Sequence, residues 1–175
     1  MLSDALGPAQ IGAALILLQR GLEEVHSRRN TRRLLQAGAH EEGRDFYPVV
    51  ATTHLCWIAS LAFLIPPSAS AHSALLTLYL LLQLVRYWVI GTLGRYWTHR
   101  IIVLPGAPLV RRGPYRLMPH PNYVVTIVET LLLPLAFGAP ALAAIFTVMW
   151  GSVLQYKIRL EDRALASRRA ITVEP

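Results

Sequence analysis

Five apolar runs constrain this chain more than any other feature of its sequence. They cover Pro8 to Leu18, Tyr47 to Ile65, Ala74 to Ile90, Tyr123 to Phe137 and Pro140 to Tyr156. Hydrophobic residues make up 54% of the chain and charged residues 15%, with a mean hydropathy of +0.41, which is typical of bilayer proteins. The sequence therefore predicts a single all-α integral membrane domain over residues 1–175, with about five transmembrane helices near 8–18, 47–65, 74–90, 123–137 and 140–156.

These runs differ in length, and the difference affects how each is expected to meet the bilayer. A helix needs about 20 mostly apolar residues to cross the hydrocarbon core. The second and third runs approach this length, whereas the first, fourth and fifth are shorter and need tilt, snorkelling or partial insertion. Only Gly138 and Ala139 separate the last two runs, so we expect them to form a tight C-terminal helical hairpin.

Arginine-rich segments between the runs set the expected orientation. Residues 20–45, 91–116 and 157–169 carry all of the Arg and Lys except Arg86, whereas 66–73 and 138–140 carry none. Because loops rich in these residues stay in the cytoplasm, the N-terminus is predicted outside and the C-terminus cytoplasmic.

Residues 20–45 are expected to include a surface helix ending near Gly38, with an arginine face on anionic headgroups. The net charge of +7 lies in blocks, not on one amphipathic face, so nucleic-acid binding is not expected.

A dense segment of polar, aromatic and ring-constrained residues precedes the fourth run, GPYRLMPHPNY at 113–123. Pro119 and Pro121 fix the backbone on both sides of His120 and place a helix directly after it. The helix N-terminus favours an anionic ligand group and a depressed pKa for His120, which would keep its ring neutral. The alternative is a proline-rich turn that caps a membrane helix, with Tyr115 and Tyr123 as interfacial aromatics.

A second polar constellation, KIRLEDRAL at 157–165, follows the fifth run. Lys157 and Glu161 are four residues apart and face the same way on a helix. Taken alone, this spacing favours a solvated, salt-bridged helix end. Helical runs of about 15 to 17 residues span roughly 22 to 26 Å at 1.5 Å per residue, and an antiparallel hairpin returns both ends to one surface. The hairpin is therefore expected to bring His120 and Glu161 together.

Two ionisable residues lie within the expected spans, Arg86 in the third and Glu129 in the fourth. Membrane charges usually indicate pairing or function, and the sequence leaves open an Arg86 to Glu129 ion pair or a role for Glu129 in a substrate cavity.

The remaining histidines show no ligand spacing, so no metal site is expected. No glycine-rich unit of the Rossmann type follows a strand, which argues against soluble-type dinucleotide or methyl-donor binding. The glycines, prolines and aromatics of 91–113 predict an ordered loop at the cytoplasmic mouth.

The two polar segments together resemble the isoprenylcysteine carboxyl methyltransferase family, whose pattern is G-x-Y-R-x-x-R-H-P-x-Y followed, after a helical hairpin, by R-I-x-x-E-E-x-x-L. The resemblance covers about Arg95 to Leu165. The upstream stretch GRYWTHRIIVLPGAPLVRRGPY is further similar to a small bacterial branch found beside type III polyketide synthases, for which alkylpyrone O-methylation is the implied activity.

The resemblance implies a cytoplasmic cofactor pocket for S-adenosyl-L-methionine within about 95–165. The matching cofactor-binding positions are Ala107, Pro108, Leu109, Val110, Tyr115, His120, Pro121, Asn122, Tyr123, Glu161 and Asp162. Aromatic faces and a carboxylate suit a sulfonium cation, and N–H donors suit the carboxylate of the cofactor. The chain departs from the family at Pro119, where the pattern has Arg, and at Lys157, where it has a substrate-facing Arg. Arg116 is the expected substitute for the arginine missing at 119.

The function these features imply is methyl transfer from S-adenosyl-L-methionine to an oxygen of a lipophilic substrate that enters from the bilayer, either an isoprenylcysteine-like carboxylate or an alkylpyrone enol. Lys157 or Arg159 is expected to orient the acceptor, and Glu129 is a candidate for the substrate cavity. A bacterial inner membrane and a polyketide synthase in the same pathway are expected as surroundings and partner. The alternatives are a membrane NADPH-dependent reductase of the sterol-reductase type and a non-enzymatic membrane scaffold.

Overall fold

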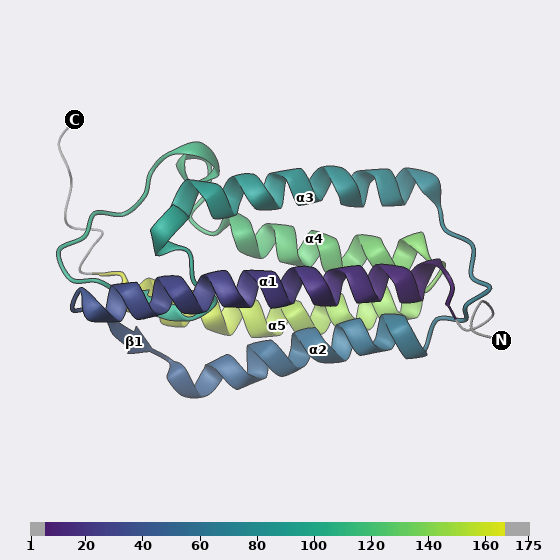
Figure 1. The fold of residues 1–175 in the computed structure, drawn as a ribbon, viewed down its shortest axis with the longest axis horizontal. Helices are drawn as coiled ribbons and strands as arrows, with labels where there is room; N and C mark the ends of the chain where they lie inside the picture. Colours follow the sequence, from purple (N-terminus) through teal and green to yellow (C-terminus); the bar gives the residue numbers. More distant parts are fainter. Residues whose placement is uncertain (1–5, 167–175) are drawn as a thin grey trace.

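Five α-helices lie side by side along the longest axis of the part of the chain that the structure describes (Figure 1). The computed structural model describes residues 6–166. In this part of the chain the helices are α1 (Pro8–Gln36), α2 (Tyr47–Phe63), α3 (Ser73–Leu93), α4 (Pro121–Ala136) and α5 (Pro140–Ala164). The chain is therefore mostly helical, as the apolar runs predict.

Helix α1 is one continuous 29-residue helix, which corrects the expectation of a short first span followed by a separate surface helix. The helix begins at Pro8, whose fixed φ suits a first turn, and it ends just before Gly38, which has φ of +90°. Polar residues in its middle suggested a membrane edge. Arg20 and Glu23 are instead buried against other helices, so no break is required there.

Helices α4 and α5 form the predicted hairpin. Pro121 lies in the first turn of α4, and Pro140 lies in the first turn of α5. Between the two helices, Gly138 adopts φ of +70°, a conformation that glycine takes without the steric cost a side chain would add. Helix α5 continues about two turns beyond the expected end of the fifth run at 156, to Ala164, so its last turns carry Lys157 and Glu161.

A small two-stranded sheet departs from the all-α expectation. Strand β1 (His40–Glu42) pairs antiparallel with β2 (Ile101–Val103), with His40 opposite Val103 and Glu42 opposite Ile101. Three short 3-10 helices, η1 (Arg44–Phe46), η2 (Gly94–Tyr96) and η3 (Gly113–Arg116), lie in the same connections. The sheet ties the long 94–120 connection to the segment that follows α1, at the end of the bundle where β1 is seen (Figure 1).

The apolar surface of the bundle suits a hydrocarbon environment. Three helical stretches are each long and apolar enough to cross a bilayer, namely 44–63 (η1 and α2), 73–96 (α3 and η2) and α5, and only 22 to 28% of their most apolar segments is buried. Leu84, Phe63 and Val148 are among the large apolar side chains left exposed. Helix α4 is apolar but shorter, at 16 residues. The buried apolar core joins all five of these helices, and it includes Ile16, Trp57, Tyr79, Leu133 and Phe146.

Candidate active site

A cavity of about 390 Å³ lies at the end of the bundle that carries the sheet and the 94–120 connection; we call it the main cavity. Its volume falls in the range usual for small-molecule sites. The residues that line it are Leu34, Leu93, Tyr96, Trp97, Thr98, Arg100, Ile101, Ile102, Leu104, Leu109, Val110, Arg111, Tyr115, Pro119, His120, Asn122, Tyr123, Glu161 and Leu165. Most of the residues singled out from the 113–123 segment therefore share one cavity with Glu161.

The α4–α5 hairpin brings His120, Tyr123 and Glu161 into direct contact. His120 Nδ1 lies 3.5 Å from Glu161 Oε2, and the hydroxyl of Tyr123 donates a hydrogen bond to the same oxygen. The rings of His120 and Tyr123 stack with their centroids 5.2 Å apart and their planes 6° apart. The expected meeting of these two chain segments is confirmed, and the resulting arrangement offers two aromatic faces beside a carboxylate.

The second acid of the motif also contacts the histidine, since Asp162 Oδ1 lies 3.1 Å from His120 Nε2. Burial lowers the pKa of His120, but hydrogen bonds and negative charge from Glu161 and Asp162 outweigh it, so the pKa lies above its ordinary value. The expectation of a depressed pKa was wrong, because two carboxylates on α5 act more strongly on the ring than the N-terminus of α4. His120 is therefore suited to carry a proton.

Tyr115 reaches the main cavity through the short helix η3. That segment approaches α3 closely at Gly113, which has φ of +54°, and a Cβ placed there would lie 2.9 Å from Thr92 Oγ1. Burial raises the pKa of Tyr115, and the charge of Glu161 raises it further. The hydroxyl of Tyr115 consequently keeps its proton and can donate a hydrogen bond.

The remaining positions of the cofactor motif divide into two groups. Leu109 and Val110 line the main cavity, and so does Asn122, whose buried Oδ1 has no hydrogen-bond partner among the described residues. Ala107, Pro108, Pro121 and Asp162 are not part of the cavity lining. A buried acceptor without a donor is costly, so Asn122 marks a position at which a ligand N–H or O–H would be stabilised.

Neither Lys157 nor Arg159, the residues expected to orient the acceptor, lines the main cavity. Lys157 is buried, donates a hydrogen bond of 2.9 Å to the backbone carbonyl of His99, and lies 5.2 Å from the centre of the Tyr123 ring. Arg159 is exposed. Lys157 thus holds the loop after η2 through its hydrogen bond to His99, and it packs against the ring of Tyr123.

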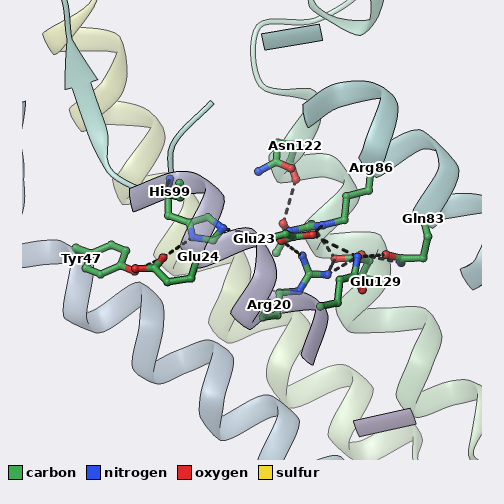
Figure 2. A network of polar contacts seen from close by, with 12 residues as sticks. Arg20, Glu23, Glu24, Tyr47, Gln83, Arg86, His99, Asn122 and Glu129 are labelled. Carbon is green, nitrogen blue, oxygen red and sulfur yellow. Dashed lines mark hydrogen bonds and ion pairs between the residues drawn. The ribbon is translucent and has the colours of Figure 1, made fainter. Parts of the chain in front are cut away.

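His99 anchors the same loop to two other helices. Its Nδ1 lies 2.8 Å from Glu24 Oε2, and Glu24 also accepts a hydrogen bond from the hydroxyl of Tyr47 at 2.9 Å (Figure 2). The backbone N–H of His99 donates to Ser27 Oγ at 2.8 Å. Together with the hydrogen bond from Lys157, these contacts hold the wall of the main cavity against α1, α2 and α5.

Two arginines in the main cavity were not singled out from the sequence. Arg100 is paired with Glu41, with both carboxylate oxygens 3.1 Å from Nη1, whereas Arg111 is exposed on the cavity wall. The expected substitute for the missing family arginine, Arg116, is exposed and does not line the cavity. The loop that carries Arg100 and Arg111 has no periodicity, and only its pairing with β1 brings these side chains to the site.

A separate group of buried charges lies between α1, α3 and α4, shown in Figure 2; we call it the four-charge cluster, consisting of Arg20, Glu23, Arg86 and Glu129. Arg86 Nη1 lies 3.1 Å from Glu129 Oε2, and Arg20 Nη2 lies 3.0 Å from Glu129 Oε1. Gln83 donates a further hydrogen bond of 2.8 Å to Glu129. Glu129 does not line the main cavity, so the structure supports its pairing role.

Comparison with known proteins agrees with this arrangement. The sequence profile of the isoprenylcysteine carboxyl methyltransferase (ICMT) family matches residues 75–167, which covers more than half of the chain and includes both polar segments. The chain belongs to the ICMT family. It is also 36% identical over 156 residues to an uncharacterized protein, YpbQ, of Bacillus subtilis (strain 168), covering 87% of this chain and 93% of that protein. No solved structure matches the chain significantly.

Family membership and the apolar helices together make this an integral membrane protein of a methyltransferase family. The profile extends from early in α3 to the end of α5. It therefore includes the η3 segment, the α4–α5 hairpin and the loop that carries Arg100 and Arg111. Helix α1 lies outside the matched range, although it contributes Leu34 to the main cavity and two residues to the four-charge cluster.

Proposed function

We propose that the protein transfers the methyl group of S-adenosyl-L-methionine to an oxygen of a lipophilic acceptor, either a carboxylate or an enol hydroxyl. The observation that carries this proposal is the gathering of Tyr115, His120, Asn122, Tyr123 and Glu161 around one cavity. These five residues stand at positions of the family motif, and they come from two segments of the chain, 113–123 and 157–165. The isoprenylcysteine-like carboxylates and the alkylpyrone enols are the two acceptor classes to be distinguished.

The chemistry of the cavity residues fits such a cofactor. Glu161 and the unpartnered Oδ1 of Asn122 are acceptors, which suits the ammonium and hydroxyl donors of S-adenosyl-L-methionine. The rings of Tyr115 and Tyr123, which line the cavity, offer aromatic surface to a cation, and Leu109 and Val110 offer an apolar wall to the adenine. When bound, the cofactor supplies an electrophilic methyl group on a positively charged sulfur.

Arg111 is the residue we assign to the carboxylate of the cofactor. The family pattern has an arginine at the position of Pro119, so that charge is missing from its usual place in the motif. Arg111, which lies in the loop before η3, lines the same cavity as Pro119. A solvent-accessible arginine can form a bidentate ion pair with a carboxylate. Such a pair would replace the arginine that the family has at the position of Pro119.

The protein's contribution to the reaction is mainly positioning and exclusion of water. Tyr123 donates its hydroxyl hydrogen to Glu161 and so holds the carboxylate in one orientation. Trp97, which is 2% exposed, forms part of the apolar wall. Correct alignment of two reacting groups accounts for a large part of the rate enhancement in transfers of this kind, and an acceptor that is already ionised requires no strong base.

The membrane setting follows from the charge pattern. We propose that the main cavity faces the cytoplasm, that the N-terminus lies outside, and that the apolar helices cross a bacterial inner membrane, with α1 and the short α4 inserted alongside the three long apolar helices. The acceptor then enters from the lipid bilayer. A polyketide synthase of the same pathway is the proposed supplier if the acceptor is an alkylpyrone. In this arrangement Lys157 affects the acceptor only indirectly, by holding the loop that contains His99 and by packing against Tyr123. Arg159 is exposed and is the basic residue left to orient an acceptor at the surface.

The test is to incubate membranes containing the protein with S-adenosyl-L-methionine labelled in its methyl group, together with alkylpyrones, prenylated thiols bearing a carboxylate, or phospholipids. Label recovered by mass spectrometry as a methyl ether or ester of one acceptor class would support the proposal and identify the class. Membranes with Glu161→Gln should lose the labelled product, whereas Glu42→Gln, an exposed control on β1, should retain it. If membranes that contain the folded protein give no labelled product with any of the acceptors, the proposal is contradicted.

A further inference from the structure

Four arginines near the end of α1 belong neither to the main cavity nor to the four-charge cluster. They are Arg28, Arg29, Arg32 and Arg33, and all four are exposed. Arg28 is paired with Glu24 at 2.6 Å. The other three have no hydrogen-bond or acidic partner among the described residues. We call Arg29, Arg32 and Arg33 the arginine stripe.

The arginine stripe continues the exposed apolar side of α1. The apolar side chains on this side are 48 to 64% exposed, and they are Ile11, Leu15, Leu18, Leu22 and Val25. Their positions repeat every three or four residues, and steps of four lead on from Val25 to Arg29 and Arg33. Residues with this spacing share one face of a helix. The arginines therefore lie on the side of α1 that meets lipid in the proposed membrane placement.

The length of α1 places the arginine stripe at the membrane surface. Arg29 lies 21 residues after Pro8, so the two are about 32 Å apart along the helix at 1.5 Å per residue. The hydrocarbon core of a bilayer is about 30 Å thick. A helix that begins at one edge of this core brings Arg29 to the headgroups of the opposite leaflet. Helix α1 reaches there the end of the bundle that carries β1 (Figure 1).

The opposite face of the same helical turns holds a wall of the main cavity. Ser27 and Asn30 are buried, and both bind the loop after η2. Ser27 Oγ accepts a hydrogen bond from the backbone N–H of His99, and Asn30 Nδ2 donates to the carbonyl of Trp97, each at 2.8 Å. Leu34 lines the main cavity itself. A ligand that fixes the exposed side of α1 therefore also stabilises the loop packed on its other side.

We propose that the arginine stripe binds the phosphate groups of anionic phospholipids in the adjoining leaflet and so anchors the end of α1. Guanidinium groups pair with phosphate oxygens in a bidentate geometry, and three neighbouring positive charges without acidic partners repel one another until anions neutralise them. An acidic soluble protein offers the same charge, but the continuity of the stripe with the exposed apolar side of α1 favours lipid. The inference rests on the proposed membrane placement of α1 and is independent of the methyl acceptor.

The first test measures lipid binding to the full chain in neutral detergent by native mass spectrometry. Arg29→Gln/Arg33→Gln should raise the dissociation constant for phosphatidylglycerol about ten- to thirty-fold, because each arginine near an anionic surface strengthens association roughly five-fold. Arg29→Lys/Arg33→Lys should keep most of the affinity, since the charge remains. Arg44→Gln/Arg163→Gln is the matched control, because both arginines are exposed and each has an aspartate next to it in the sequence. Equal effects of the two glutamine pairs would overturn the assignment to the stripe.

The second test compares melting temperatures in nanodiscs of phosphatidylglycerol and of phosphatidylcholine. The unmodified protein should melt at least about 2 °C higher in phosphatidylglycerol, and Arg29→Gln/Arg33→Gln should remove this difference without lowering the melting temperature in phosphatidylcholine. Glycerol phosphate added to phosphatidylcholine nanodiscs should not reproduce the shift. An equal shift with glycerol phosphate would assign the stripe to a soluble phosphate, and no shift in phosphatidylglycerol would leave it to a soluble acidic partner. Either result contradicts the proposal, and neither measurement depends on methyl transfer.

Discussion

The main cavity and the four-charge cluster are both polar assemblies in a largely apolar bundle, but they differ in how completely their groups are paired. In the cluster, every charge is paired: all four carboxylate oxygens of Glu23 and Glu129 accept hydrogen bonds from arginine or glutamine side chains, although Arg20 Nε has no hydrogen-bond partner among the described residues. In the cavity, Asn122 Oδ1 has no partner among the described residues, and Arg111 is exposed on the wall.

The difference indicates separate roles. A buried group in which positive and negative charges are paired across helices holds those helices together, and removal of one member leaves an uncompensated charge in a low-dielectric interior. A polar site with unused donors and acceptors has capacity for a ligand. We therefore expect changes in the cluster to affect stability first, and changes in the cavity to affect binding first.

The largest effect should come from Glu129→Leu. The cluster contains two arginines and two glutamates, so this variant leaves one uncompensated positive charge among Arg20, Arg86 and Glu23. We expect a loss of about 3–5 kcal/mol in unfolding free energy, measured by denaturant titration in detergent. Adding Arg86→Met should recover part of the loss by removing the unpaired charge. Equal stability of Glu129→Leu and the unmodified protein would show that the cluster does not hold the bundle.

The next effect should appear in binding, not stability, on changing Glu161. Glu161→Gln removes the charged acceptor for Tyr123 and His120 while keeping the side-chain shape. The affinity for S-adenosyl-L-methionine should fall about ten- to one-hundred-fold, as expected for a hydrogen bond to a charged group worth roughly 1.5–3 kcal/mol. Calorimetry would measure it. If Glu161→Gln instead lowers the stability of the protein and the folded fraction still binds S-adenosyl-L-methionine with normal affinity, Glu161 has a structural role and not a binding role.

A smaller change is expected for Arg111→Ala. Because this arginine is exposed, its ion pair with the cofactor carboxylate should be worth at most about 1 kcal/mol, or roughly five-fold in affinity, and the loss should shrink as salt rises. Arg112→Ala is the matched control, since Arg112 is the exposed neighbour and does not line the cavity. If the two variants bind equally well, Arg111 does not replace the family arginine.

The smallest effect concerns the pH dependence of stability at His120. Its folded pKa lies above the ordinary value of 6.5, so its contribution is fully present below 6.5 and is lost as pH rises through the folded pKa. The melting temperature of the unmodified protein should exceed that of His120→Gln, and the difference should be largest at low pH. In unfolding free energy the difference should be less than about 1 kcal/mol. A difference that grows with rising pH would mean that His120 is held neutral, as the helix-terminus argument first suggested.

The sequence predicted the meeting of the two polar segments because the signals for it are local. Proline at the start of α4 and α5, glycine between them, and apolar runs of matched length specify a hairpin without knowledge of the rest of the fold. The positions of His120 and Glu161 then follow from helix geometry.

Other features depend on contacts that no local pattern records. Helix α1 continues through Arg20 and Glu23 only because partners on α3 and α4 neutralise them, and the charges alone resemble a membrane edge. Strand β2 has three residues, too few for an alternating pattern, so its pairing with β1 and the resulting placement of Arg100 and Arg111 could not be foreseen. The pKa of His120 was misjudged because Glu161 and Asp162 both act on the ring across the hairpin, and the sequence does not show how strongly they do so.

The most direct measurement of the central claim is a calorimetric titration of the detergent-purified protein with S-adenosyl-L-methionine and, separately, with NADPH. We predict saturable binding of S-adenosyl-L-methionine at one site per chain, its loss in Val110→Trp, which fills the main cavity, and no binding of NADPH. Saturable NADPH binding, or S-adenosyl-L-methionine binding that survives both Val110→Trp and Glu161→Gln, would contradict the assignment of the main cavity to the methyl donor.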